Sequence, residues 1–141
     1  KIIQNNLGGF DGKTIEIKAY FNDPANEENY YLFAYSYQNP LVNNYYAGED
    51  TFFQGNEFFS TSQNGDLKAG DKIGITHFGI SKTYSNYIKV LVSIAGNSNG
   101  APFQSPAATV RGNIINTTDF DNYALGYFSV SEADTKNYDV Q

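Results

Sequence analysis

The sequence predicts a mainly β fold, an antiparallel β-sandwich or barrel-like sheet with one α-helix packed against it over about residues 81–95. Short segments in which apolar and polar residues alternate recur along the chain, which is the pattern of half-buried strands. Turn-forming pairs such as Asn64-Gly65 separate these segments. A single stretch has helical spacing, whereas a parallel α/β fold needs a helix between successive strands.

Two strands are expected in the first part of the chain. Apolar residues alternate with polar ones in Lys13–Phe21, and Tyr30–Tyr37 carries aromatic residues on both faces, as a central strand does. The turn-rich loop 22–29 between them makes these strands candidates for pairing as neighbours. Residues 38–60 are expected to form a long loop with short strands, the last near Glu57–Thr61.

The second part of the chain is expected to hold a hairpin turn, the helix and further strands. The turn lies at Asn64-Gly65, and Lys72–Phe78 follows as a strand. Ser81 can cap the helix, whose apolar residues recur at helical spacing until Gly96 stops it. Gly96–Pro106 is rich in Gly, Asn, Ser and Pro and predicts a loop. The remaining strands are expected around Thr109–Ile115, Leu125–Ser131 and, as a short last one, 136–140.

Composition limits the class of protein. A chain of 141 residues fits one β-rich domain, 1–141. The net charge of −6 and the single arginine, Arg111, argue against nucleic acid as a partner. Because the chain lacks cysteine, disulfides, thiolate catalysis and cysteine zinc sites are excluded. No apolar run reaches about 18 residues, so no membrane span is expected. The absent initiator Met suggests a processed chain or a fragment.

Few residues are suited to catalysis, and we expect no catalytic residue, no metal site and no cofactor. The single histidine, His77, shares a strand face with Ile73 and Ile75, which predicts a packed or half-buried residue and not a catalytic base. Asp119 and Asp121 resemble the start of a calcium loop, but the fifth position and the turn glycine are not matched. Phosphate-binding glycine motifs are absent.

Aromatic doublets are the most unusual feature of the sequence. Adjacent residues of a strand point to opposite faces, so one ring of a doublet would be exposed and the other buried. Sugars and peptides dock on exposed rings, while core packing is the alternative role. The predicted ligand-binding residues lie within 43–59: the rings of Tyr45, Tyr46, Phe52 and Phe53 for contact area, with Glu49 and Asp50 to orient the ligand.

Three ordered stretches resemble a known family. Leu67–Ile73 leads into Ile80–Tyr87, the Pro102-Phe103-Gln104-Ser105-Pro106 loop is followed by the Gly112-Asn113 segment, and Leu125-Gly126-Tyr127-Phe128-Ser129-Val130-Ser131 comes last. The region from Asp23-Pro24 to Tyr30-Tyr31 also fits. Together they resemble the C-terminal part of domain-of-unknown-function family 4249, outer-membrane lipoproteins of Bacteroidota-type bacteria, over essentially the whole chain.

The resemblance implies a cell-envelope protein at the outer membrane, held there only through an upstream lipid anchor. This chain would be the C-terminal part of a longer lipoprotein, with an immunoglobulin-like region before it. It would act as a non-enzymatic binding or accessory module with a TonB-dependent receptor, capturing a small nutrient such as a sugar or peptide. The alternatives are a structural or adhesin-type surface domain that uses its sheet edges for assembly and, third, a hydrolase with a carboxylate pair.

Overall fold

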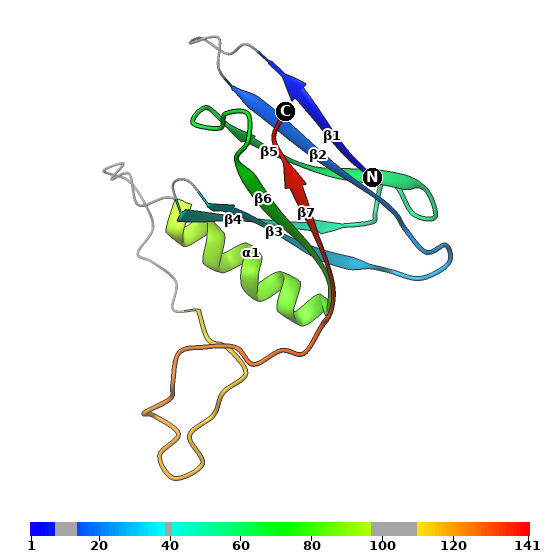
Figure 1. The fold of residues 1–141 in the computed structure, drawn as a ribbon. Coiled ribbons are helices and arrows are strands. Elements are labelled where there is room, and N and C mark those ends of the chain that lie inside the picture. Colours follow the sequence, from blue (N-terminus) through cyan, green and yellow to red (C-terminus); the bar gives the residue numbers. More distant parts are fainter. Residues whose placement is uncertain (8–13, 39–40, 97–109) are drawn as a thin grey trace, which may run out of the picture.

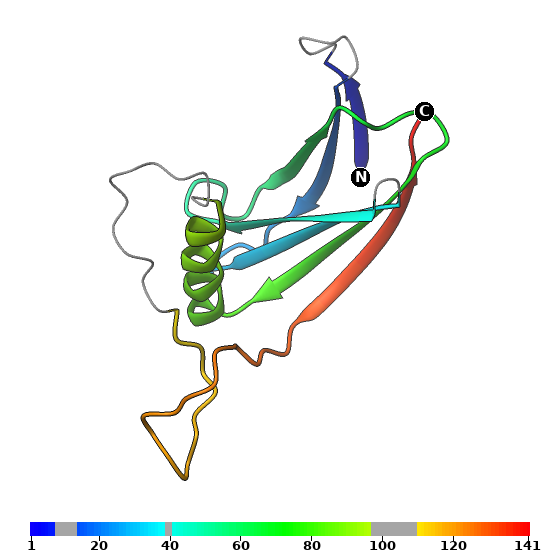
Figure 2. The ribbon, with the colours of Figure 1, turned by 90° about the vertical axis from the view of Figure 1, so that its left-hand side faces the viewer.

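Two antiparallel sheets face each other, and a helix lies on the outer surface of the larger one (Figures 1 and 2). The computed structural model describes residues 1–7, 14–38, 41–96 and 110–141. The mainly β sandwich predicted from the sequence is confirmed, and it does not close into a barrel within these residues. The elements are β1 (Ile2–Asn6), β2 (Ile15–Asn22), β3 (Tyr30–Gln38), β4 (Leu41–Glu49), β5 (Glu57–Asn64), β6 (Lys72–Ile80), α1 (Lys82–Gly96) and β7 (Glu132–Asp139).

The strand order places β2 and β3 in different sheets. One sheet has the order β1-β2-β5 and the other the order β4-β3-β6-β7, with antiparallel neighbours throughout. β3 is central in its sheet, as predicted, but the predicted pairing of β2 with β3 is wrong. Both strands direct apolar side chains at one core, so residues 23–29 carry the chain across the sandwich and not back along the same sheet.

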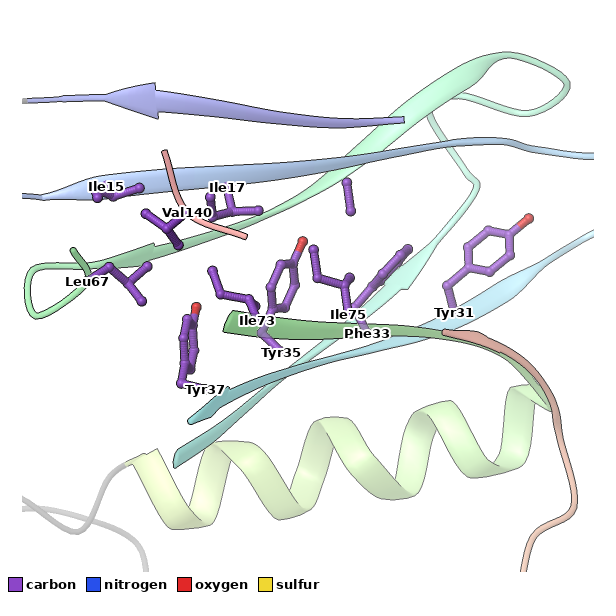
Figure 3. Packing of buried hydrophobic residues seen from close by; sticks show 11 residues of the cluster. Ile15, Ile17, Tyr31, Phe33, Tyr35, Tyr37, Leu67, Ile73, Ile75 and Val140 are labelled. Carbon is purple, nitrogen blue, oxygen red and sulfur yellow. The ribbon is translucent and has the colours of Figure 1, made fainter. Parts of the chain in front are cut away.

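The core fills the space between the sheets (Figure 3). Ile17 from β2 and Tyr35 from β3 have 0 % exposure. Burying an isoleucine side chain stabilises the fold by roughly 1.5–3 kcal/mol. One end of the core is closed by Val140, which exchanges backbone hydrogen bonds with Asp71 and Gly70 at 2.9 and 2.8 Å. The clustered residues include Ile15, Ala19, Tyr31, Phe33, Tyr37, Leu67, Ile73 and Ile75.

Helix α1 confirms the predicted helix almost to its bounds. Ser81 caps it, because its Oγ accepts the Tyr84 N–H at 3.2 Å. The helix lies against the face of the four-stranded sheet that is turned away from the core (Figure 3). That face includes the buried side chains of Leu32 and Ala34, so β3 is covered on both sides.

The region predicted as a long loop is mostly regular strand. β4 pairs with β3 along its whole length, from Leu41 to Glu49, so the loop prediction for 38–60 is wrong there. β5 begins at Glu57 as predicted and continues to Asn64. β4 is an edge strand, and a polar, asparagine-containing segment is acceptable in an edge position because pairing with β3 supplies its backbone hydrogen bonds. Residues 50–56 form the turn between β4 and β5.

One turn prediction and two strand predictions in the second half are also wrong. Asn64-Gly65 does not form a hairpin, since β5 and β6 belong to different sheets. Residues 110–115 and 125–131 are not strands, and Thr109 lies outside the described residues, as do 97–106 of the predicted loop. The last strand, β7, covers 132–139 and is longer than expected, because it pairs with β6 along its length.

The segment 110–131, here called the arm, extends away from the two sheets (Figures 1 and 2). The Asn113 side chain joins its two limbs, because its amide donates to the Phe128 carbonyl at 2.7 Å and accepts the Phe128 N–H at 2.8 Å. Arg111 also crosses between the limbs, with its guanidinium 3.8 Å from the centroid of the Tyr123 ring. The limbs approach so closely that a Cβ at Gly112 would lie 1.4 Å from the Gly126 carbonyl oxygen. Glycine is therefore required at position 112.

Candidate functional site

Tyr46 and Phe53 are the two predicted binding residues that face the space between the sheets. Tyr46 pairs in register with the core residue Phe33, and its hydroxyl lies 3.1 Å from the Ser62 Oγ. Phe53, in the turn after β4, stacks on Phe58 with 4.0 Å between ring centroids and 2° between planes. The two side chains therefore reach the same edge of the sandwich from different elements.

Tyr45 and Glu49 lie on the opposite face of β4. Tyr45 pairs with Ala34, so it is turned to the side of the sheet that carries the helix, with its ring half exposed. Glu49 forms an ion pair of 2.8 Å with Lys89 of α1. Alternation within β4 thus separates Tyr45 from Tyr46, as expected for a doublet inside a strand.

Asp50 and Phe52 occupy contrasting positions in the turn 50–56. Asp50 is 5 % exposed, and its carboxylate accepts the Asn29 N–H at 2.7 Å. Phe52 is 95 % exposed and makes no ring contact within the described residues. The six predicted residues are therefore not one cluster: two line the inner edge, two lie on the helix side, one supports the turn and one points into solvent.

Tyr46 and Phe53 line a recess at the open edge between β4 and β5, here called the aromatic recess. Its volume is about 180 Å³. None of the described residues that line it is charged, so it suits an apolar or neutral group. Gly48 lies on its wall, and a Cβ added at that position would meet nothing within 4 Å. The rings that contribute to it are Phe21, Tyr31, Phe33, Tyr46, Phe53, Phe58 and Phe59.

Five of these rings were missed by reasoning from the sequence. Phe58 and Phe59 formed one of the aromatic doublets, and their position at the start of a predicted strand could have included them. Phe21, Tyr31 and Phe33 come from β2 and β3, on the other side of the loop 23–29. Only the folded arrangement brings those strands to the recess, so no local pattern could have revealed them.

The phenols of Tyr31 and Tyr35, in and beside the recess, are neutral over the physiological range. Burial, together with the hydrogen bond that Tyr31 donates to Asp23, raises the pKa of Tyr31 well above its usual value. Burial raises the pKa of Tyr35 to about 12. The recess therefore offers ring faces and neutral hydroxyl groups, which recognise shape and apolar surface.

The single histidine is packed in the strand, as predicted. The ring of His77 lies flat on Phe33, with 4.5 Å between centroids and 2° between planes. Burial lowers the pKa of His77, and the carboxylate of Asp134 opposes that effect. Among the described residues no hydrogen bond reaches its buried Nε2 atom. In the same part of the chain no three His, Asp or Glu side chains come together in a way that could hold a metal ion.

Comparison with models of known protein families shows which family the sequence matches. A family model described as "Domain of unknown function (DUF4249)" matches residues 2–137. No curated protein and no solved structure gives a significant match. Among the residues that the structure describes, no helix has both the length and the apolar character needed to cross a membrane.

Proposed function

The chain belongs to the DUF4249 family, and from this premise we propose that it is a non-enzymatic binding module of a cell-envelope lipoprotein at the outer membrane. It binds an extended peptide through the aromatic recess and acts with a TonB-dependent receptor in nutrient capture. The envelope location and the receptor follow from the resemblance of the sequence to outer-membrane lipoproteins. The site is argued from the geometry of the recess.

The observation that carries the proposal is the uncharged, ring-lined recess of about 180 Å³ at an open sandwich edge. Ligand sites are mostly apolar and concave, with a few polar groups that fix orientation. Here the polar groups on the wall include the hydroxyls of Tyr46 and Ser60. A recess of this size accommodates one apolar side chain and not a whole drug-sized ligand, which usually needs about 300–1,000 Å³.

The strands beside the recess favour a peptide over a sugar. β4 ends one sheet and β5 ends the other, so no described strand pairs with the outer edge of either. A peptide can add to such an edge through main-chain hydrogen bonds while alternate side chains enter pockets. One apolar side chain of the peptide would then occupy the recess, and exposed Phe52 in the adjoining turn would add contact area.

Filling the recess tests this site. Gly48→Leu places a side chain where the wall is open, so the variant should fold and lose the docking position. The probes are fluorescein-labelled extended hexapeptides with a central Phe, Leu or Ser, measured by fluorescence polarisation. We expect the Phe and Leu peptides to bind the parent and to bind Gly48→Leu at least ~10-fold more weakly, a loss of about 1.4 kcal/mol.

Gly79→Leu is the matched control, because Gly79 also has open space around its Cβ position but lies at the opposite edge of the sandwich. It should bind the peptides like the parent. Equal affinity for the Phe and Ser peptides would contradict recognition by the recess. Unchanged peptide binding by Gly48→Leu would show that the peptide is recognised elsewhere on the molecule.

A further inference from the structure

A second, larger hollow opens at the other edge of the sandwich, where the loop 23–29 meets the start of β7. Its volume is about 750 Å³, and its wall includes Tyr31, His77, Gly79 and Asp134. A neighbouring hollow of about 300 Å³ lies between β2 and β7 and shares His77 and Asp134 with it. The two hollows, which meet at His77, are here called the His77 cleft.

The inner part of the cleft is aromatic and apolar. His77 stacks on Phe33 at 4.5 Å and lies 4.9 Å from the ring of Tyr31. The smaller hollow adds apolar wall from Ile2 and Ile75, and Lys1 and Lys136 also line it. The one polar atom of this inner part that lacks a partner among the described residues is the buried Nε2 of His77, because the Tyr31 hydroxyl already donates to Asp23.

The outer part of the cleft is acidic. Glu27, Glu28, Glu132 and Asp134 line the larger hollow, and none of its described lining residues is Lys or Arg. Glu28 forms an ion pair with Lys82 at 3.1 Å, and Asp134 forms an exposed ion pair with Lys136 at 3.8 Å. No described side chain pairs with the carboxylate of Glu27 or Glu132. Carboxylates gathered at the mouth of an apolar cleft attract and concentrate cations.

We propose that the His77 cleft binds a small organic cation, an ammonium or guanidinium group carried on an aliphatic or aromatic skeleton. The skeleton occupies the ring-lined inner part, and the charged group lies between the carboxylates of Glu132 and Asp134. This site is separate from the aromatic recess and takes a ligand of opposite character, since the recess has uncharged walls.

The chemistry of each part agrees with such a ligand. The size of the larger hollow lies in the range of small-molecule sites, about 300–1,000 Å³. Tyrosine faces attract organic cations. Tyr31 lines the cleft, as does Tyr30, whose ring already has the Lys82 ammonium 5.7 Å from its centroid. Because burial keeps the pKa of His77 low, the imidazole is neutral at pH 7. Its Nε2 is then an acceptor for an N–H donor in the tautomer protonated at Nδ1.

A pair of isosteric probes separates charge recognition from apolar binding. Phenethylamine and 2-phenylethanol differ at one end, where the first carries an ammonium and the second a hydroxyl group. Titrations are followed by calorimetry and by the ring resonances of His77, the single histidine of the chain. We expect saturable binding of the amine, at least ~10-fold weaker binding of the alcohol, and a further fall in the pKa of His77 when the cation is bound.

Variants locate the site. Asp134→Asn should weaken phenethylamine binding at least ~10-fold, whereas Asp66→Asn, the same acid-to-amide change in the loop between β5 and β6, should leave it unchanged because Asp66 lines neither hollow. Gly79→Leu should abolish binding by filling the cleft, because a Cβ at Gly79 meets nothing within 4 Å. Gly48→Leu, which fills the aromatic recess, should bind the amine like the parent.

The proposal is overturned if phenethylamine shows no saturable binding, if 2-phenylethanol binds equally well, or if Gly79→Leu binds the amine normally. Should Asp134→Asn fail to fold, the Gly79→Leu result and the comparison of the two probes decide the matter. Loss of peptide binding in Gly48→Leu concerns the aromatic recess alone, so the two proposals fail independently.

Discussion

Two buried aspartates hold together the loops at one end of the sandwich. Asp23 accepts hydrogen bonds from the Tyr31 hydroxyl and, at 2.7 Å, from the Gly55 N–H. Asp50 accepts the Asn29 N–H at 2.7 Å and returns its own N–H to the Asn29 carbonyl at 3.2 Å. Each carboxylate therefore bridges the loop 23–29 and the turn 50–56. These bonds position the turn that carries Phe52 and Phe53 beside the aromatic recess.

Neighbouring acids of this region should differ sharply in their effect on stability. Asp50→Ala leaves the part-buried Asn29 N–H without its carboxylate and should lower the free energy of unfolding by about 1–3 kcal/mol. Glu49→Ala removes an exposed ion pair with Lys89, which is worth at most about 1 kcal/mol. Urea denaturation of the two variants gives the comparison. Equal, small losses would mean that the Asp50 carboxylate does not support the turn.

At the scale of elements, a polar ladder crosses the outer face of the three-stranded sheet. Glu16 on β2 accepts from Asn5 on β1 at 2.9 Å and from Gln63 on β5 at 3.3 Å, and Lys18 lies 3.4 Å away. These contacts, the bond from Asn5 first among them, lower the pKa of Glu16. The short strand β1 is thereby attached to its neighbour by a side-chain bond as well as by backbone pairing.

The ladder predicts a pH-dependent contribution from Asn5. Because the Glu16 carboxyl has a folded pKa below its ordinary value of 4.5, its stabilisation is fully present above pH 4.5 and is lost as the pH falls through the folded pKa. Asn5→Ala should therefore be less stable than the parent at pH 7, and the difference should shrink on acidification. Chemical denaturation across this range measures it.

Gln63→Ala is the matched control for that experiment. It removes the longer and weaker of the two amide donors to Glu16, so its pH-dependent loss should be smaller than that of Asn5→Ala. A loss in Asn5→Ala that is the same at every pH would assign the effect to packing and not to the carboxylate.

Elements with a strong local pattern could be predicted from the sequence, whereas the pairing of strands within each sheet could not. Each predicted element faces the core or a covering layer, so its sequence pattern reflects which of its side chains are buried. This holds for the alternation in β2, the aromatic residues on both faces of β3 and the helical spacing in α1. β4 was not predicted as a strand, because Asn43 and Asn44 do not form a strand-like pattern. They suit an exposed edge strand, which is held in its extended form by pairing with β3. The assignment of β2 and β3 to different sheets depends on contacts between distant residues, which no local pattern contains.

The binding residues were predicted in part for the same reason. The 43–59 segment does contribute Tyr46 and Phe53 to the aromatic recess, and whether these residues bind a ligand stays a prediction. Phe58 and Phe59 lie in the same segment and could have been included, whereas Phe21, Tyr31 and Phe33 come from strands that meet it only in the folded sandwich. The His77 cleft was not foreseen at all, because its acidic mouth combines the loop 23–29 with the start of β7.

At the scale of the whole molecule, the arm is the part least joined to the sandwich. Its apolar residues are largely in solvent, including Ile115, Phe120, Leu125, Phe128 and Val130 at 68–85 % exposure. Tyr127 is the exception, with its ring 4.9 Å from Tyr84 of α1 and its hydroxyl bonded to Thr83. The arm is thus attached to the helix near its base, while its tip is separate from the core.

Changes at the tip should therefore alter association more than stability. The double variant Ile115→Ser and Phe120→Ser should shift the free energy of unfolding by no more than about 0.5 kcal/mol while reducing self-association at high concentration. Ile17→Ala, in the core, should cost about 2–5 kcal/mol. Urea denaturation and light scattering test both. A large loss of stability in the double variant would show that the tip is packed in solution.

The rings of Phe21, Tyr31 and Phe33 stand between the two open edges of the sandwich. Phe21 lies 4.8 Å from His77 on one side and 5.8 Å from Phe53 on the other, so it borders both the His77 cleft and the aromatic recess. Each glycine variant fills one site and leaves the other free, whereas Phe21→Ala removes a wall that both sites share. This single change should therefore weaken the binding of peptide and of cation together, as the same two probes would measure.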